Sequence, residues 1–403
     1  MEFCYKVPSA MLASLLRTNR RQKDKIVGRA LVLFLLFVVP LVSGQTNSQS
    51  IEPEPSQDHA LLKIDVRKFG YKPPGIEQPD RLSLAFTESN DILVAWTNLD
   101  DPHSKKTLRS NTPVPSHLHA LVLDARTGQK QHGGEWPSRY LEASITPVGK
   151  ENFLICAGDE IRLLSGDFTT VRDQVLSAPT TCLGLRLSPS RRSFSTRTKS
   201  GADNNLIDAE SFQSLAQWSS HEAIDVHFTD TVLVGACRPD FDLCIREFNQ
   251  PWQPFHVDGI KQDLRAYGKL GPTFVNDTTL STADGGKIAV VTLEGAILIN
   301  VNLPQKFFFA RIATSTGGQR FAYIETEERG SRALDMASTF DDHVVVYDLG
   351  QKKAIYTRKL NGGSPWIPPF EHGNRIALSA DGTLLAILVD GIIEVYQLPA
   401  LNS

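Results

Sequence analysis

Two pairs of residues have the types and the spacing that a metal site could use. His117 and His119 stand two positions apart, so a strand would place both imidazoles on one face. Two ligands are too few, and the sequence shows no third beside them. Asp100 and Asp101 are adjacent carboxylates without the glycine and alternating ligands of a calcium loop. We interpret the histidines as solvated surface residues and the aspartates as turn residues, and we predict no metal site.

The motifs of common catalytic sites are missing from the sequence. It contains no nucleophile-elbow serine, no glycine-rich phosphate loop and no zinc-protease motif. A formal charge of -3 also gives no basic field that could hold a phosphate backbone. The sequence therefore predicts no catalytic residue, no cofactor and no nucleic-acid partner.

Cysteines offer a different kind of chemistry. Cys237 and Cys244 flank the segment RPDFDL, which is the length of a turn between two strands. They could face each other across a hairpin and close a disulfide in an oxidising compartment. Cys156 and Cys182 fall in strands that we assign to neighbouring blades, and we expect both to be free buried thiols.

The elements that would position these residues are short strands. Runs rich in Val, Ile, Leu, Phe and Thr are separated by Gly, Asp, Asn and Pro, and sustained helical periodicity is missing. Seven apolar strands each end at a polar residue, and these end residues are separated by 41, 43, 41, 51, 48 and 49 residues. A period of about 40 to 50 residues is typical of propeller blades. The strand ends are Asp124, Ser165, Asp208, Asn249, Asn300, Asp348 and Gln397.

Tight turns supply a second repeating mark. Ala-Asp-Gly occurs at Asp284 and at Asp381, each 16 residues before one of the strand ends. Ser188-Pro189-Ser190 and Thr316-Gly317-Gly318 occupy similar places. In such turns an Asp side chain bonds to the turn backbone and a Gly supplies a positive φ. We therefore interpret these acidic residues as structural rather than catalytic.

These marks carry a family resemblance. Ser379-Ala380-Asp381-Gly382 before LLAIL and IEVYQL, and Val346-Tyr347-Asp348 before Leu349-Gly350, resemble the signatures of WD-repeat and YVTN-type propellers, especially exported bacterial ones. The resemblance covers residues 60–403. It implies an all-β fold with a single β-propeller, and it implies no particular function, because propellers serve as scaffolds, receptors and enzymes alike.

The blade count and the closure of the ring follow from the spacing. Residues 81–399 divided into seven four-stranded blades give about 46 residues per blade, with six and eight blades as alternatives. After the strand IIEVYQL too few residues remain for an outer strand. That strand must come from elsewhere, or its neighbour presents an unpaired edge. We predict that residues 61–69, LLKIDVRKF, supply it and close the ring.

Export is expected from the N-terminal segment. A basic stretch precedes the apolar residues 30–42, a run shorter than the roughly 20 residues of a membrane-spanning helix. We expect a signal peptide at 1–44 with cleavage before Gln45, a flexible linker at 45–58, and the propeller domain at 59–403. An uncleaved membrane anchor is the alternative. The expected location is periplasmic or extracellular.

The positions of the longest irregular segments limit the functions that the sequence supports. The longest insertions, Asp100 to Ser116 and Glu328 to Asp342, are both expected to join the second and third strands of a blade, and so to open on one face. This arrangement favours a non-enzymatic binding or scaffold propeller that recognises a protein, peptide or glycan. The alternative is a hydrolase or lyase with acidic and His side chains converging in the central channel. A group of these side chains with metal geometry would favour the enzyme.

Overall fold

The computed structural model describes thirteen stretches of the chain, all within the compact unit Gln49–Ser403. The predicted signal peptide and linker lie outside them. None of the described residues forms a helix with the length and hydrophobicity needed to cross a membrane. The stretches are 59–72, 82–99, 116–138, 143–157, 160–175, 185–197, 203–240, 242–257, 273–284, 287–302, 307–329, 339–360 and 375–401.

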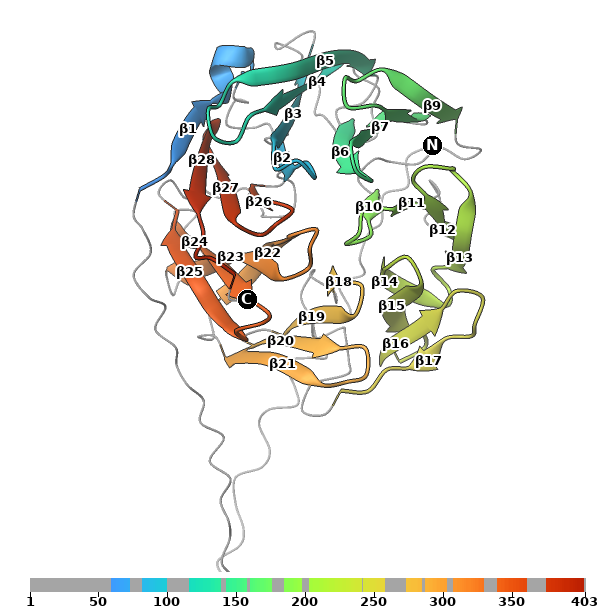
Figure 1. Ribbon diagram of the computed structural model, residues 1–403. Helices are drawn as coiled ribbons and strands as arrows, with labels where there is room; N and C mark the ends of the chain where they lie inside the picture. The colour runs from blue at the N-terminus through green and yellow to red at the C-terminus, as the bar shows by residue number, and fades with distance from the viewer. Residues whose placement is uncertain are drawn as a thin grey trace, which may run out of the picture. The chain divides into compact units, whose positions relative to one another are not determined.

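The described strands form seven four-stranded antiparallel sheets arranged in a ring. Figure 1 shows each sheet as one blade, with its first strand nearest the centre and its fourth strand outermost. The described residues contain a single short helix, the 3-10 helix η1 (Val66–Phe69). The prediction of an all-β propeller with seven blades is confirmed.

Blades 1 to 4 follow the chain order without interruption. Blade 1 comprises β2 (Ser83–Phe86), β3 (Ile92–Leu99), β4 (Ser116–Leu123) and β5 (Lys130–Ser138). Blade 2 comprises β6 (Ser144–Val148), β7 (Asn152–Ala157), β8 (Glu160–Leu164) and β9 (Thr170–Val175). Blade 3 comprises β10 (Arg186–Leu187), β11 (Ser193–Arg197), β12 (Asp203–Asp208) and β13 (Ser214–Ser219). Blade 4 comprises β14 (Ala223–Phe228), β15 (Val232–Cys237), β16 (Asp242–Glu247) and β17 (Gln253–Pro254).

Blades 5 and 6 continue this order, and blade 7 combines the two ends of the chain. Blade 5 comprises β18 (Thr273–Asn276), β19 (Thr279–Asp284), β20 (Lys287–Thr292) and β21 (Ile297–Asn302). Blade 6 comprises β22 (Phe307–Thr314), β23 (Arg320–Arg329), β24 (Thr339–Asp348) and β25 (Lys353–Lys359). Blade 7 comprises β26 (Ile376–Leu378), β27 (Leu384–Val389), β28 (Ile392–Gln397) and, as its fourth strand, β1 (Leu62–Asp65).

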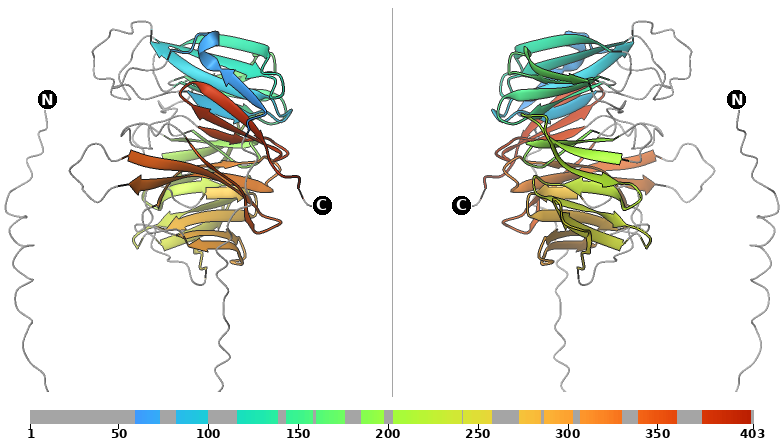
Figure 2. Two further views of the ribbon diagram at one scale, coloured as in Figure 1. Left: turned by 90° about the vertical axis from the view of Figure 1, so that its left-hand side faces the viewer. Right: turned by 90° about the vertical axis from the view of Figure 1, so that its right-hand side faces the viewer.

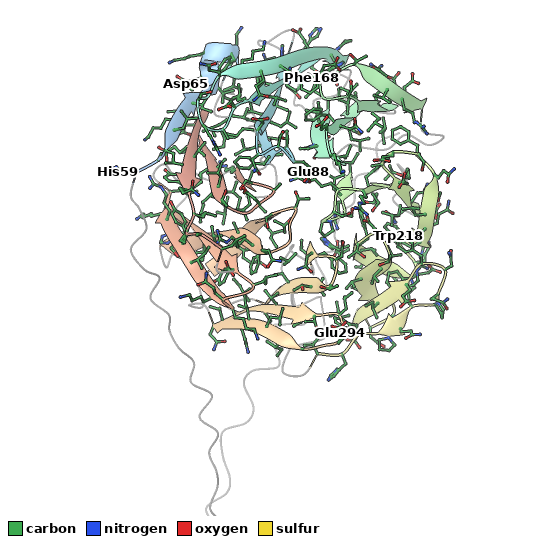
Figure 3. The ribbon with its side chains drawn as sticks, in the orientation of Figure 1. His59, Asp65, Glu88, Phe168, Trp218 and Glu294 are labelled. Carbon is green, nitrogen blue, oxygen red and sulfur yellow. A yellow bond between two sulfur atoms is a disulfide. The ribbon has the colours of Figure 1, made fainter. Side chains whose placement is uncertain are left out.

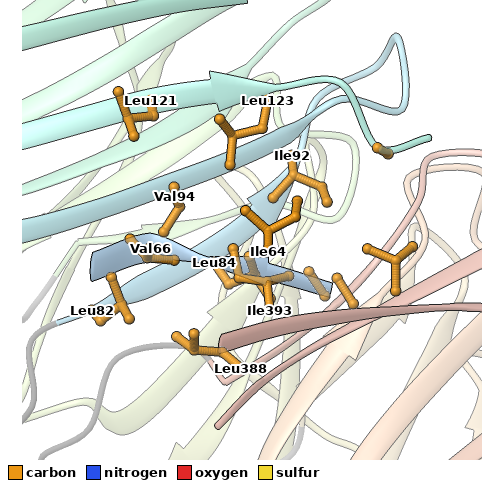
Figure 4. Packing of buried hydrophobic residues seen from close by; sticks show 14 of the residues in the cluster. Ile64, Val66, Leu82, Leu84, Ile92, Val94, Leu121, Leu123, Leu388 and Ile393 are labelled. Atoms are coloured by element: carbon orange, nitrogen blue, oxygen red, sulfur yellow. The ribbon is translucent and has the colours of Figure 1, made fainter. Parts of the chain in front are cut away.

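The ring is closed by the N-terminal strand, as predicted. β1 pairs antiparallel with β28, from Leu62 opposite Val395 to Asp65 opposite Ile392. The strand is shorter than the predicted 61–69, because Asp65 caps η1 by accepting a hydrogen bond from the Arg67 amide. Ile64 packs beside Ile393 and Leu388 of blade 7, and beside Leu84 and Ile92 of blade 1 (Figure 4).

The core is divided among the junctions between blades. Second strands such as β7 and β27 are buried along most of their length, because each blade packs against a neighbour on both faces. The outer strand β5 is exposed at most positions. Seven buried clusters result, one at each junction of neighbouring blades. The apolar runs of the sequence are therefore explained by packing between blades.

One of the predicted repeating marks is wrong. Asp381 lies between the first and second strands of blade 7, whereas Asp284 ends β19 and so stands between the second and third strands of blade 5. Asn300 correspondingly lies in a fourth strand, not at the end of a third. The equal offset was coincidental, because consecutive strands of one blade share the same apolar pattern. The turn of blade 5 that corresponds to Asp381 is the one at Asp277.

Candidate functional site

The alternation of strand direction gives the ring two faces with different kinds of connection. Turns between first and second strands, and between third and fourth strands, lie on one face, which we name the turn face. Connections from second to third strands, and from each blade to the next, lie on the other, which we name the connection face. Turn-face links are short, such as Thr87 to Asp91 and Asp124 to Gln129.

The connection face is where the long segments leave the blades. Both predicted insertions follow the second strand of a blade and so lie on the connection face, as expected. The insertion in blade 6 is shorter than predicted, because β23 continues to Arg329 and β24 begins at Thr339. The connections 258–272 and 361–374 also leave from this face, between blades. Sequence reasoning missed them because it compared insertions only within blades. Asp100 and Asp101 belong to the first insertion and lie outside the described residues.

A short disulfide-linked hairpin lies on the connection face of blade 4. The structure joins Cys237 and Cys244 in a disulfide, with Cα atoms 5.8 Å apart. Gly235 pairs with Cys244 and Cys237 pairs with Asp242 across the two strands. The Arg238 amide donates to the Glu222 carbonyl, 3.0 Å away. The exposed tip is therefore held both by the disulfide and by the link from blade 3 to blade 4.

The remaining cysteines differ from expectation. Cys156 is fully buried and is also disulfide-bonded, so the prediction of a free thiol there is wrong. Cys182 lies outside the described residues. Formation of the Cys237–Cys244 bond in the exported protein stays a prediction.

The histidine pair of blade 1 is less exposed than predicted. The His119 ring stacks on Trp96 with centroids 5.3 Å apart, and its Nδ1 lies 3.6 Å from Glu135. Burial lowers the pKa of His119, and His117 adds to this effect while Glu135 opposes it. The two histidines are half-buried rather than fully solvated, because alternate residues of β4 face the junction with blade 7.

The first strands bring charged side chains to the centre of the ring. Arg186 of β10 places Nη1 3.0 Å from His227 Nε2 of β14 and donates to the Val226 carbonyl. Burial, and then Arg186, hold the pKa of His227 well below its usual value. The imidazole is therefore neutral near pH 7, with Nε2 accepting from the guanidinium. Sequence reasoning missed this pair because two different blades contribute it.

The turn-face end of the centre carries carboxylates from adjacent blades. Burial, with Asp230 nearby, raises the pKa of Asp277, and Arg192 opposes the rise. Asp230 itself accepts hydrogen bonds from Ser190 and Ser193, at 2.6 and 2.8 Å. Figure 3 places Glu88 beside the centre of the ring. The carboxylates of Asp230 and Asp277 are thus partly offset by cations and hydroxyl donors rather than left as a bare acidic pair.

The described part of the chain shows no assembled metal site, either at the centre of the ring or on its faces. Within those ranges, no three His, Cys, Asp or Glu side chains are grouped as metal ligands. The feature that would favour the hydrolase or lyase alternative is therefore not found among the described side chains.

The turn face is instead organised by turn hydrogen bonds. Asp124 Oδ1 accepts from the amides of Arg126 and Thr127, and Asp208 accepts from Glu210 and Ser211 in the same way. These bonds lower the pKa of Asp124. Asp381 accepts from Ser379 and Thr383. The interpretation of the turn acids as structural matches this geometry.

Comparison with known proteins finds similar solved structures but no matching family. No protein-family model and no curated protein matches the chain. The C-terminal WD40 domain of Sif2 is similar at 10% identity with a TM-score of 0.49, covering 85% of this chain and 98% of that domain. Hsv2 from Kluyvelomyces marxianus is similar at 11% identity with a TM-score of 0.41, covering 63% and 71%. The strand pairing itself defines the class, which is a seven-bladed β-propeller.

Proposed function

We propose that this chain is an extracytoplasmic, non-enzymatic binding or scaffold propeller that recognises a protein ligand through its connection face. The observation that carries the proposal is the division between the faces. The long connections all leave from one face, while the other is closed by short turns that bond to one another. Rigid blades that carry long loops on one side are suited to recognition, since loops can vary without cost to the core.

The ends of the described chain both lie at the turn face and leave the connection face uncovered by them. β1 begins opposite Val395 and ends opposite Ile392, so the described chain enters the last blade from the turn face. The Leu398 amide donates to the Thr383 carbonyl in a turn of the same face.

Export and recognition require separate experiments. Mass spectrometry of the exported protein should find Gln45 as the N-terminus, and an intact leader on a membrane-bound product would support the anchor instead. For recognition, purified propeller with residues 101–114 or 362–373 replaced by Gly-Ser linkers should fold but lose ligands that the native protein captures from envelope extracts. Replacing the exposed Glu151 on the turn face by Lys provides the control. Equal capture by all variants would contradict recognition through the connection face.

A further inference from the structure

The second and third strands of blade 6 form a ribbon that extends beyond the outer strand of that blade. β23 and β24 each have 10 residues and pair without a break to their last rung, Arg329 opposite Thr339. The outer strand β25 pairs with β24 only as far as His343. Figure 2 shows the paired ends of the ribbon reaching past the neighbouring strands. No described strand therefore pairs with the outer edge of β24 over residues 339–342.

Blade 1 shows how the same position is covered elsewhere in the ring. Its third strand β4 also begins after a long connection, and the outer strand β5 pairs with it up to its first residue, Ser116 opposite Ser138. In blade 6, residues 339–342 have a strand partner only on the β23 side. Amide and carbonyl groups along the open side of a strand are a template for a further strand. The connection face of blade 6 thus presents an open strand edge.

The residue types at the end of the ribbon determine which partner this edge accepts. Like charges on neighbouring strands destabilise their pairing, and opposite charges stabilise it. A second copy of this chain would bring the same negative charge to the edge, whereas an extended basic segment would be attracted. The last four rungs carry four acidic residues against one basic residue: Glu327, Glu328, Asp341 and Asp342 against Arg329.

We propose that the outer edge of β24 at residues 339–342 binds an extended, basic segment of a partner protein by strand addition. In this mode of recognition, backbone hydrogen bonds supply affinity and side chains supply specificity. Blade 7 contains the same arrangement within the chain, since β1, with 4 residues, pairs with the outer edge of β28. The inference rests on the proposed recognition of a protein through the connection face, and it names the chemistry of the partner.

Fluorescence anisotropy with a labelled Lys-Val-Lys-Val-Lys-Val peptide tests the proposal on the signal-free protein. We expect saturable binding at one site per chain that weakens as salt is added, because salt screens the attraction between exposed charges. The same peptide with N-methylated backbone amides keeps its charge but loses its hydrogen-bond donors, and it should not bind. Equal binding of the two peptides would overturn strand addition, and so would absence of binding or tighter binding of Glu-Val-Glu-Val-Glu-Val.

Two variants of the ribbon locate the binding edge. Thr326 stands opposite Asp342, so a two-residue Asn-Gly turn in place of residues 327–341 closes a shorter hairpin and should abolish peptide binding. Asp341→Asn combined with Asp342→Asn should weaken binding about fivefold, as expected for the loss of two opposite-charge pairs across strands. Circular dichroism of each variant would show that the propeller is still folded.

Two exposed carboxylates of the turn face provide the matched control. Glu151→Gln combined with Glu294→Gln removes the same charge from the opposite face of the ring and should leave peptide affinity unchanged. Equal weakening by the two double variants would mean diffuse attraction and would overturn the site. A protein with the shortened hairpin that still captures the ligands lost on replacing residues 101–114 would overturn this edge but leave recognition through the connection face intact.

Discussion

The turn face and the connection face use the same strands but are constrained differently. On the turn face, bonds run from blade to blade. Asn90 of blade 1 donates to Asp381 of blade 7 at 3.1 Å, and Asn276 of blade 5 donates to the Gly318 carbonyl of blade 6 at 3.0 Å. A short turn cannot be lengthened without breaking such bonds. The connection face tolerates insertions, so stability is concentrated on one side and variation on the other.

A buried ion pair is the deepest element of the turn face. Arg320 is fully buried, its Nε donates to Asp348 at 3.0 Å, and its Nη1 donates to the Gly382 carbonyl of blade 7 at 2.8 Å. Gly382 has a φ of 70°, and a Cβ there would approach the Arg320 side chain at 3.3 Å. The pair therefore links blades 6 and 7 where only glycine combines this backbone conformation with this close approach.

Loss of the closing strand should have the largest effect, because both faces depend on a closed ring. Deleting residues 61–69 removes the burial of Ile64 and Val66, worth about 1.5–3 kcal/mol for each side chain, and exposes the edge of β28. We expect a lower melting temperature and self-association by light scattering. Ile64→Pro should act in the same direction more mildly. Unchanged melting and a monomeric deletion product would show that β1 is dispensable.

Breaking the buried ion pair should be the next largest effect. Asp348→Ala leaves the Arg320 charge buried without its carboxylate, which costs about 3–5 kcal/mol, and chemical denaturation would measure the loss. Asp240→Ala in the exposed hairpin tip of the connection face is the control and should change stability by less than about 0.5 kcal/mol. Equal losses in the two variants would contradict the proposed difference between the faces.

The disulfide hairpin should show an intermediate effect, because it is a rigid element on the more variable face. Replacing Cys237 and Cys244 together by Ser should cost about 2 kcal/mol through the unfolded state, as measured by denaturant unfolding. In the exported protein, both should resist alkylation until reduced under denaturing conditions. Since Cys156 is also bonded, labelling must be assigned peptide by peptide. Labelling of both residues without reductant would end the disulfide proposal.

The smallest effect on stability is expected where β1 pairs with β28 to close the ring, and this effect depends on pH. Glu394 lies 2.5 Å from Lys63 of β1 and 3.6 Å from Arg358 of blade 6. Burial raises the pKa of Glu394, but the bonds from Lys63 and Tyr396 outweigh it, so the net pKa lies below the ordinary 4.5. The ionised form is therefore favoured in the folded state. Its stabilisation is complete above pH 4.5 and is lost as the pH falls through the lowered value.

Comparing the native protein with Glu394→Gln would measure this contribution. The native protein should be more stable by about 1 kcal/mol at pH 7, and the difference should shrink as the pH falls below the ordinary carboxyl pKa of 4.5 and through the lowered pKa of Glu394. The comparison requires full unfolding curves at each pH, because other carboxylates also titrate in this range. A constant difference between the two proteins would show that the ion pairs with Lys63 and Arg358 contribute nothing to closure.

The sequence by itself determined the architecture. Apolar strands with turn residues between them repeat along the chain, and each blade is local in sequence, so the spacing predicted seven blades, with six and eight as alternatives. The missing outer strand after Gln397 and the spare strand near Ile64 even predicted the closure. The cysteine spacing predicted the hairpin for the same reason, since Cys244 follows Cys237 by seven positions.

Only the tertiary structure decided which residues from different blades meet. Arg186 and His227, or Arg320 and Gly382, come together because the ring curvature brings neighbouring blades into contact, and no local pattern encodes that contact. The same packing stacked His119 on Trp96, where the sequence showed only two histidines on a strand.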